Sequence, residues 1–204
     1  MCEDNKNLSI FEFRNNEKYY LTMKKSFVFM ADGFEEIEAL AVVDMLRRAA
    51  MPVSMVSISD EFDVEGAHGV IILADEILAE ADFSDAEWLI LPGGMPGSAN
   101  LAACAPLVNL LKAHNEADGK IAAICAAPMV LGENGILEGK NATCYPGFED
   151  HLKGANYTAA QVERDGNIVT GNGPAQAIMF AAAIIEKSLG ETTAQRILEG
   201  MMRK

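Results

Sequence analysis

Residues that commonly bind metals are sparse in this chain of 204 residues. Its three histidines, His68, His114 and His151, are scattered along the sequence. Its four cysteines lack the paired spacing of a zinc site or of a redox CxxC motif. The sequence therefore predicts no metal site.

The chain also lacks a secretion signal. Residues 1–22 begin with polar side chains, and no apolar run of signal-peptide length follows them. Met23 then leads directly into an apolar segment, so we interpret residues 1–22 as a disordered tail or as the product of an over-called start codon, with a functional tail as the alternative. Without a secretion signal, we expect a cytoplasmic protein whose cysteines are reduced thiols.

Basic residues are few compared with acidic ones. The chain has 16 Lys and Arg against 30 Asp and Glu, which gives a formal net charge of −14. This charge would repel the phosphates of nucleic acids and the headgroups of anionic membranes. We therefore expect neither a nucleic acid nor a membrane as a stable partner, and solubility is a sufficient explanation of the acidic excess.

The sequence contains no repeat, low-complexity stretch or evident interdomain linker. Half of its residues are hydrophobic, and short apolar strands alternate with helical patterns, which indicates an α/β fold with a parallel sheet covered by helices on both faces. Residues 23–204 are expected to form one domain. Strands are expected near residues 25–31, 52–58, 70–73, 87–92, 120–125 and 141–144, a hairpin near 158–171 with its turn at Asp165-Gly166, and helices near 35–50, 105–117, 126–134, 174–189 and 191–202.

The most informative single residue is Cys125. It follows an apolar stretch typical of a buried strand and precedes a helix start with Pro128 in the first turn, where a missing N–H is tolerated. Cys125 would thus occupy a strand-to-helix turn of the nucleophile-elbow kind. The unpaired N–H groups of a helix start favour the thiolate, which is the nucleophilic form. The alternative is an inert cysteine of the core.

A pair of glycines follows a second buried strand. Gly93 and Gly94 come directly after the apolar stretch that ends at Leu91 and Pro92. Because ligands of open α/β sheets bind beyond the carboxyl ends of the strands, these glycines could present N–H groups as oxyanion donors beside Cys125. A tight turn that only needs glycine for its backbone angles is the alternative.

The first expected helix carries a carboxylate on its apolar face. Glu38 shares a stripe with Val42 and Met45, so its side chain should pack against the sheet. Burial would raise its pKa and let it exchange a proton near neutral pH. The alternative is a partly exposed glutamate that complements the helix dipole, which is the role we assign to Glu35 and Glu36.

Four short motifs together carry a family resemblance. They are Asp32-Gly33-Phe34-Glu35-Glu36-Ile37-Glu38, Leu91-Pro92-Gly93-Gly94, Ala123-Ile124-Cys125-Ala126-Ala127-Pro128 and Gly171-Asn172-Gly173-Pro174. In this order the chain resembles the ThiJ/PfpI superfamily, in the branch of the parkinsonism-associated protein deglycase and its bacterial relatives. The resemblance covers about residues 24–202 and implies a flavodoxin-like three-layer α/β/α sandwich with a mostly parallel sheet and a cysteine nucleophile elbow.

The resemblance also implies roles for individual residues. Cys125 would be the oxidisable nucleophile, Glu38 the buried carboxylate hydrogen-bonded to it, and the N–H groups of Gly94 and Ala126 the oxyanion pocket. Candidates for lining the pocket are Glu35, His68, Tyr145, Gly173 and Pro174. A homodimer is the assembly that the resemblance implies, with the first helix and its Arg47 and Arg48 as a candidate interface.

Two positions depart from the pattern of the family. Tyr145 stands where some members carry a histidine that could assist the cysteine, so no Cys–His dyad forms there. His68 stands where the human-type sequence has an arginine near the pocket. Such a histidine could contact an anion or polarise a ligand, or it could be an exposed loop residue.

Other activities of the superfamily fit this sequence poorly. Peptidase-type members place a histidine directly after the nucleophile, and this chain has Ala126 there. Related glutamine amidotransferases use a late histidine in a His-x-Glu pattern, whereas the last histidine of this chain, His151, is not followed by one.

The function implied by the resemblance is a cofactor-independent glyoxalase III or deglycase. Its substrates would be α-oxoaldehydes such as methylglyoxal and glyoxal, or their early adducts on proteins. Cys125 would form a hemithioacetal and Glu38 would act as general acid and base. The alternative is an oxidative-stress sensor or redox-regulated chaperone, in which the same cysteine is oxidised to sulfinic acid without turnover.

Overall fold

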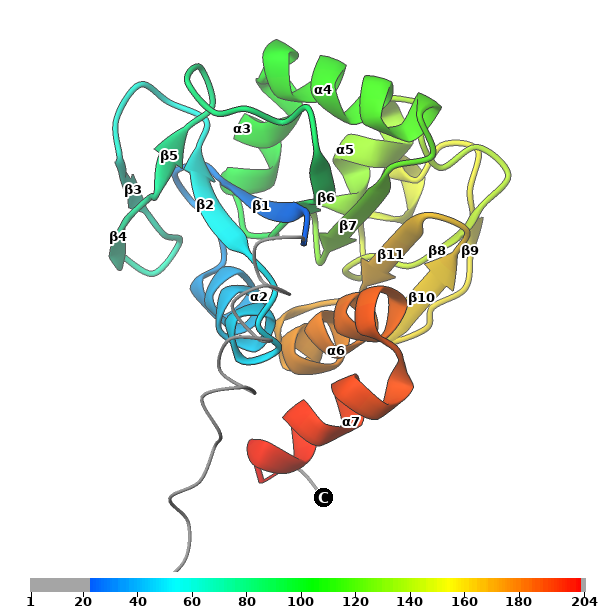
Figure 1. The fold of residues 1–204 in the computed structure, drawn as a ribbon. Helices are drawn as coiled ribbons and strands as arrows, with labels where there is room; N and C mark the ends of the chain where they lie inside the picture. The colour runs from blue at the N-terminus through cyan, green and yellow to red at the C-terminus, as the bar shows by residue number, and fades with distance from the viewer. Residues whose placement is uncertain (1–22, 203–204) are drawn as a thin grey trace, which may run out of the picture.

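A computed structural model describes residues 23–202 of the chain. Its centre is a seven-stranded sheet with the order β10-β11-β7-β6-β1-β2-β5, and all neighbouring pairs are parallel except β10 and β11 (Figure 1). The strands are β1 (Lys25–Met30), β2 (Val53–Ser57), β5 (Glu76–Ile77), β6 (Ala86–Leu91), β7 (Lys120–Ile124), β10 (Val162–Asp165) and β11 (Ile168–Gly171).

Helices cover both faces of this sheet. One face carries α2 (Glu36–Arg48), α6 (Ala177–Leu189) and α7 (Glu191–Gly200), and the other carries α3 (Gly97–Ala103), α4 (Ala105–Glu116) and α5 (Pro128–Glu133). The predicted three-layer α/β/α sandwich with a mostly parallel sheet is therefore confirmed.

Alternating side chains of the central strands build the two halves of the core. In β1, Phe27 and Phe29 pack with α3, α4 and α5, whereas Val28 and Met30 pack with α2 and α6. Because every residue from Phe27 to Met30 is buried, β1 is apolar on both faces, as strands between two helical layers must be.

Several elements differ from the sequence predictions. The strand expected near 70–73 is β4 (Ile71–Leu73), which pairs with β3 (Asp63–Glu65) in a separate ribbon rather than in the main sheet. The strand expected at 141–144 is reduced to β8 (Asn141–Ala142), paired with β9 (Asn156–Tyr157). The predicted hairpin turns one residue later than expected, because Asp165 pairs with Ile168 and leaves Gly166 and Asn167 as the loop.

The short elements were the ones missed. No sequence pattern predicted β3, β5, β9 or α3, which are too short to show a clear periodicity. Residues 1–22, interpreted above as a tail or an over-called start, lie outside the described residues.

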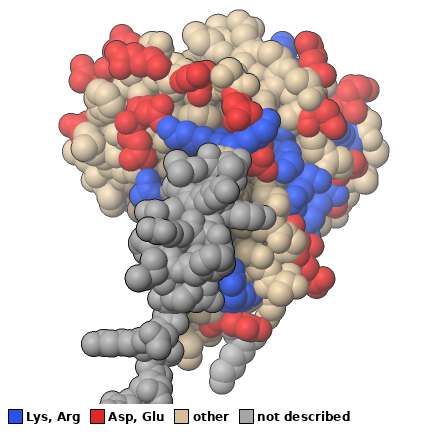
Figure 2. Space-filling view, in the orientation of Figure 1, with Lys and Arg blue, Asp and Glu red and all other residues tan. Residues whose placement is uncertain are grey.

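The surface reflects the acidic composition. Acidic side chains are spread over the face seen in Figure 2, and Lys and Arg are fewer. Within residues 23–202, no helix combines the length and the apolar character needed to cross a bilayer.

Candidate active site

Cys125 occupies the strand-to-helix turn that the sequence predicts. It directly follows β7 with a φ of 64°, a conformation that costs an L-residue about 1–2 kcal/mol. Its N–H donates to the carbonyl oxygen of Gly171 at 2.8 Å, and its own carbonyl accepts the N–H of Tyr145 at 2.8 Å. These two bonds hold the strained turn against the end of β11 and the segment that follows β8, and Cys125 is 8% exposed.

Glu38 is the buried carboxylate expected on α2. Its side chain is fully buried, and Oε2 accepts the N–H of Gly93 at 2.7 Å. Oε1 has no hydrogen-bond partner within residues 23–202. Burial raises the pKa of Glu38 to about 7, although the hydrogen bonds with Gly93 and Cys125 oppose this rise. Glu38 can therefore gain or lose a proton at neutral pH.

Gly93 lies between the two reactive side chains. A Cβ on Gly93 would lie 2.5 Å from the Cβ of Cys125 and 2.6 Å from Oε2 of Glu38. Only glycine leaves room for both groups at this place. The prediction that Gly93 supplies an oxyanion donor is wrong, because its N–H is already bonded to Glu38.

The N–H groups of Gly94 and Ala126 are directed at the sulfur. Both form hydrogen bonds that lower the pKa of Cys125. Among the backbone hydrogen bonds of residues 23–202, neither N–H donates to a carbonyl oxygen. They are therefore not used by carbonyl groups and are available to stabilise negative charge on the sulfur or on an oxygen bound to it.

The resting state of Cys125 differs from the predicted thiolate. Burial and the charge of Glu38 raise the pKa of Cys125 to about 12, and the N–H groups of Gly94 and Ala126 only partly offset this rise. The expectation that the helix start alone would stabilise a thiolate is therefore wrong. The thiol lies beside the carboxylate of Glu38, because both would contact a Cβ at Gly93, and the pKa near 7 of Glu38 leaves that carboxylate partly ionised at neutral pH.

A second polar cluster lies at the start of α2. The backbone N–H of His68 donates to Oε1 of Glu36 at 2.7 Å, and the ring Nδ1 of His68 lies 2.7 Å from Oε2 of the same carboxylate. Oε2 of Glu35 is 3.8 Å from that Nδ1. The structure therefore brings the predicted residues Glu35 and His68 together and adds Glu36.

The charges of this cluster shift each other's proton affinity. The hydrogen bond with Glu36 and the charge of Glu35 raise the pKa of His68. Burial would raise the pKa of Glu36, but hydrogen bonds from His68 and from backbone N–H groups outweigh it and hold that pKa below its usual value. Sequence reasoning assigned Glu36 only to the helix dipole, because no local pattern links it to a loop more than thirty residues away.

Backbone contacts join this cluster to the cysteine site. The N–H of Glu35 donates to the carbonyl oxygen of Gly93 at 2.9 Å, and the N–H of Ala67 donates to that of Phe34 at 2.8 Å. The charge of Glu35 also raises the pKa of Glu38.

The remaining predicted pocket residues lie on the other side of Cys125. A Cβ on Gly173 would lie 3.3 Å from the ring of Tyr145, a residue that is 45% exposed. Pro174 begins the short 3-10 turn Pro174–Gln176 that follows Gly173. Tyr145 thus forms part of the surface next to the cysteine.

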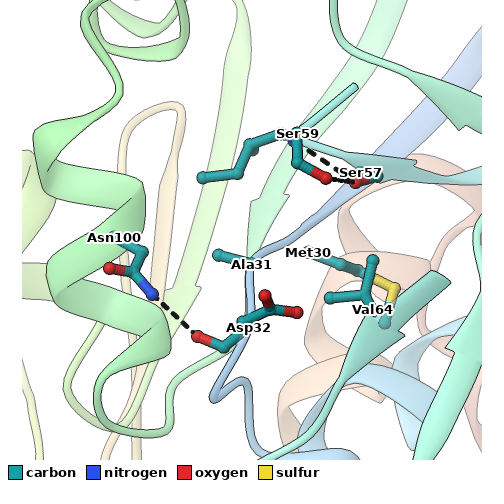
Figure 3. Close-up of a pocket in the computed structure, with 8 residues that line it drawn as sticks. Met30, Ala31, Asp32, Ser57, Ser59, Val64 and Asn100 are labelled. Atoms are coloured by element: carbon teal, nitrogen blue, oxygen red, sulfur yellow. Dashed lines mark hydrogen bonds between the residues drawn. The ribbon is translucent and has the colours of Figure 1, made fainter. Parts of the chain in front are cut away.

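The cavity shown in Figure 3 is a different feature. It has a volume of about 230 Å³ and contains neither Cys125 nor Glu38. It lies at the carboxyl ends of β1 and β2, where Asn100 of α3 donates to the carbonyl oxygen of Asp32 at 2.9 Å. Its lining residues are Met30, Ala31, Asp32, Ser57, Ile58, Ser59, Val64 and Asn100.

Comparisons with known proteins identify relatives of this chain. The DJ-1/PfpI family model matches residues 24–187. "Protein DJ-1 homolog B" of Arabidopsis thaliana is 38% identical over 177 residues, which are 85% of this chain and 40% of that protein. "Glutathione-independent glyoxalase DJR-1.2" of Caenorhabditis elegans is 33% identical over 167 residues, which are 81% of this chain and 88% of that protein. The chain spans less than half the length of the two Arabidopsis relatives, 40% and 44%.

A solved structure extends the likeness to the fold. Oxidised Toxoplasma gondii DJ-1 matches with a TM-score of 0.82 at 35% identity, over 88% of this chain and 98% of that one. The order of the elements, the cysteine turn and the family model lead to the same assignment, so the chain belongs to the DJ-1/PfpI family.

Proposed function

We propose that this chain converts α-oxoaldehydes such as methylglyoxal and glyoxal to hydroxy acids without glutathione. The observation that carries the proposal is the arrangement of Cys125 and Glu38 on either side of Gly93, with two free N–H groups at the sulfur. The relative of C. elegans that is named a glutathione-independent glyoxalase supports it.

The first step couples a proton transfer to nucleophilic attack. Glu38 acts as general base and removes the proton of the Cys125 thiol as the sulfur adds to the aldehyde carbon of the substrate. The carbonyl oxygen becomes an alkoxide, which the N–H groups of Gly94 and Ala126 stabilise. In other enzymes one such donor contributes about 2.7–4 kcal/mol. Glu38 then returns its proton to the alkoxide, which completes the hemithioacetal.

The second step moves a hydrogen between two carbons. The carboxylate of Glu38 removes the hydrogen from the former aldehyde carbon, and the electrons form an enediolate. The protonated Glu38 then delivers a proton to the adjacent carbon, which gives a thioester on Cys125. Water hydrolyses this thioester, so methylglyoxal and one water yield lactate and the free thiol. A pKa near 7 suits Glu38 to both directions of this transfer.

The test is lactate formation from methylglyoxal without glutathione. We expect lactate from the native protein and none above background from Cys125→Ser or Glu38→Gln. Cys104→Ser is the matched control, because Cys104 is a free, partly exposed cysteine outside the site. Equal lactate from the native protein and from Cys125→Ser would disprove the proposal.

One observation favours a second candidate, a redox sensor or redox-regulated chaperone. A relative from Toxoplasma gondii is known in an oxidised form. A protonated Glu38 could donate a hydrogen bond to a sulfinic acid on Cys125. Sulfinic acid on Cys125 under mild peroxide, without any lactate from methylglyoxal, would favour this candidate.

We also propose a homodimer and, as further substrates, early aldehyde adducts on proteins. Exposed apolar side chains on α2 and β4 support the dimer, and the contact between Glu36 of α2 and His68 links α2 to the loop that precedes β4. These side chains are Ile37, Leu40, Ile71 and Leu73. Sedimentation equilibrium of native protein and Ile71→Asp tests the dimer, and a native monomer at micromolar concentration would contradict it.

A further inference from the structure

Three potential metal ligands converge at the start of α2. They are Oε2 of Glu35, Oε2 of Glu36 and Nδ1 of His68, and all three atoms lie within 4.8 Å of one another. Nδ1 of His68 is 2.7 Å from Glu36 and 3.8 Å from Glu35. Ligands around a tetrahedral zinc ion, at bond lengths of about 2.1 Å, lie about 3.4 Å apart. The two distances from Nδ1 of His68, 2.7 and 3.8 Å, lie on either side of this value.

Glu36 is held in the orientation of a metal ligand. Its Oε1 accepts the backbone N–H of His68 at 2.7 Å, which fixes the carboxylate and leaves Oε2 as the ligating atom. Gly66 makes room for it, because a Cβ there would lie 2.3 Å from Oε1. Hydrogen bonds that orient a ligating carboxylate in this way are typical of metal sites.

Glu35 supplies an independent reason to expect a cation. Its side chain is only 13% exposed, yet no N–H or O–H within residues 23–202 hydrogen-bonds to its carboxylate. Among residues 23–202, its only opposite charge within 4 Å is that of His68, which already contacts Glu36 at the shorter distance. A largely desolvated carboxylate is costly without a partner, and a divalent cation would provide one.

We propose that Glu35, Glu36 and His68 form a binding site for a first-row divalent metal ion, with Zn²⁺ as the ion that fits the donor set. Two carboxylate oxygens and one imidazole nitrogen are borderline-to-hard ligands that bind Zn²⁺ in other proteins. The side chain of His68 is 68% exposed, so water can complete the coordination. The proposed glyoxalase reaction uses no metal, so this site would be separate from it.

A second histidine–glutamate pair provides the comparison. Nδ1 of His151 lies 2.7 Å from Oε1 of Glu133, the same separation as in the pair of His68 and Glu36. No third ligand joins His151 and Glu133 among the residues that the structure describes. If an ordinary ion pair were enough to bind metal, both pairs would do so.

Calorimetric titration of the full chain with Zn²⁺ tests the proposal. All proteins would carry Cys125→Ser, so that the nucleophile cannot bind the ion. We expect one equivalent of Zn²⁺ to bind, and His68→Ala to abolish this binding. Glu35→Gln is the sharper variant, because it removes a ligand and leaves the pair of His68 and Glu36 intact. It should weaken binding by at least about tenfold, as lost metal-site contacts do elsewhere.

Matched controls decide between the outcomes. His151→Ala should bind Zn²⁺ as tightly as the parent protein. Replacement of Zn²⁺ by Co²⁺ should give a visible spectrum without a thiolate-to-cobalt band, which excludes the other cysteines as ligands. Absence of binding by the parent protein, or equal affinity of the parent and Glu35→Gln, would overturn the proposal. Neither result would affect the lactate assay, so the two proposals can fail separately.

Discussion

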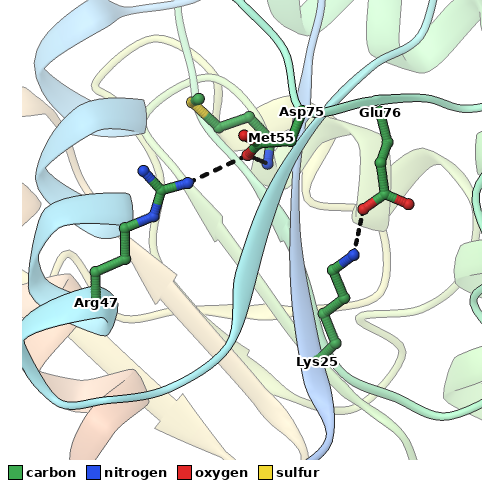
Figure 4. A network of polar contacts seen from close by, with 5 residues as sticks. All are labelled: Lys25, Arg47, Met55, Asp75 and Glu76. Atoms are coloured by element: carbon green, nitrogen blue, oxygen red, sulfur yellow. Dashed lines mark hydrogen bonds and ion pairs between the residues drawn. The ribbon is translucent and has the colours of Figure 1, made fainter.

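Charged side chains are paired at the amino end of the parallel sheet and incompletely paired at its carboxyl end. At the amino end, Lys25 at the start of β1 pairs with Glu76 of β5 (Figure 4). Nζ of Lys120 at the start of β7 is likewise 2.5 Å from Oε1 of Glu87 in β6. Asp75 accepts the backbone N–H of Met55 at 2.8 Å and contacts Arg47 at 3.2 Å. Each of these charges has an opposite partner and remains partly exposed.

The carboxyl end leaves its groups strained or incompletely paired. Cys125 has a left-handed backbone conformation, and the fully buried Glu38 has an oxygen without a partner within residues 23–202. Glu35 adds a largely buried carboxylate beside them. Such features destabilise a fold and persist where the surrounding structure enforces them, which is the usual situation at functional sites. The proposed function accordingly places the chemistry at the carboxyl end, and the paired charges of the amino end contribute to folding.

The largest effect is expected on the rate of lactate formation, when a carboxylate at each end of the sheet is replaced in turn. Glu38→Gln should reduce the rate of lactate formation by about 10²–10⁴-fold, because it removes the group that carries the proton. Glu87→Gln, which neutralises a carboxylate at the amino end, should change the rate by less than about twofold, because surface ion pairs contribute little. Initial rates with methylglyoxal check both values, and equal losses in the two variants would contradict the division between the ends.

The stability of the folded chain should depend on the protonation of Glu38. Its pKa is about 7 in the folded protein and 4.5 for an unperturbed glutamate, so between these pH values the folded chain holds a proton that the unfolded chain has lost. The free energy of unfolding should therefore fall as the pH rises from 4.5 to 7, by about 3 kcal/mol at most. Urea titrations at several pH values check this. Glu38→Gln should lose this contribution, and an unchanged pH dependence in that variant would contradict the assignment.

Gly93→Ala tests the close packing of the site. The added Cβ meets Cys125 at 2.5 Å and Glu38 at 2.6 Å, so we expect a loss of about 1–3 kcal/mol in the free energy of unfolding. Gly200→Ala is the control, because nothing lies within 4 Å of the position of its Cβ. Chemical denaturation of the two variants measures the difference. Equal stabilities would show that the site can relax around a methyl group.

The smallest effect is expected at the amino end. Lys25→Met removes the ion pair with Glu76 but keeps the apolar part of the side chain. We expect a loss of less than about 1 kcal/mol in the free energy of unfolding, because both groups are partly exposed. Denaturation in low and high salt checks this, since an exposed pair weakens as salt is added. Breaking a buried ion pair costs more than about 2 kcal/mol. A loss of that size in Lys25→Met would contradict the view that the amino end holds only weak, partly exposed pairs.

The sequence predicts those parts of the fold that depend on local pattern. β1, β7 and α2 follow from apolar runs and helical periodicity, and the turn at Cys125 follows from a strand that ends next to Pro128. The burial of Glu38 is also visible in the helical stripe of α2. Local patterns suffice here because one element determines its own conformation and its buried face.

The rest of the site depends on contacts between distant segments. Nothing near Gly93 in the sequence indicates that its N–H is bonded to Glu38, 55 positions away. The pairing of Glu36 with His68 likewise requires the β3–β4 ribbon to fold against α2. The net proton affinity of Cys125 could not be predicted either, because it is set by burial and by Glu38 more than by the nearby helix start.

The central claim is that Cys125 and Glu38 act as one unit across Gly93. Alkylation of Cys125 by iodoacetamide, followed by peptide mass spectrometry from pH 5 to 9, tests it most directly. In the native protein the rate should rise up to about pH 7 and then level off, because above the pKa of Glu38 the pair shares a single proton. In Glu38→Gln the rate should continue to rise with pH, as for an isolated thiol of raised pKa. Superimposable profiles for the two proteins would contradict the account.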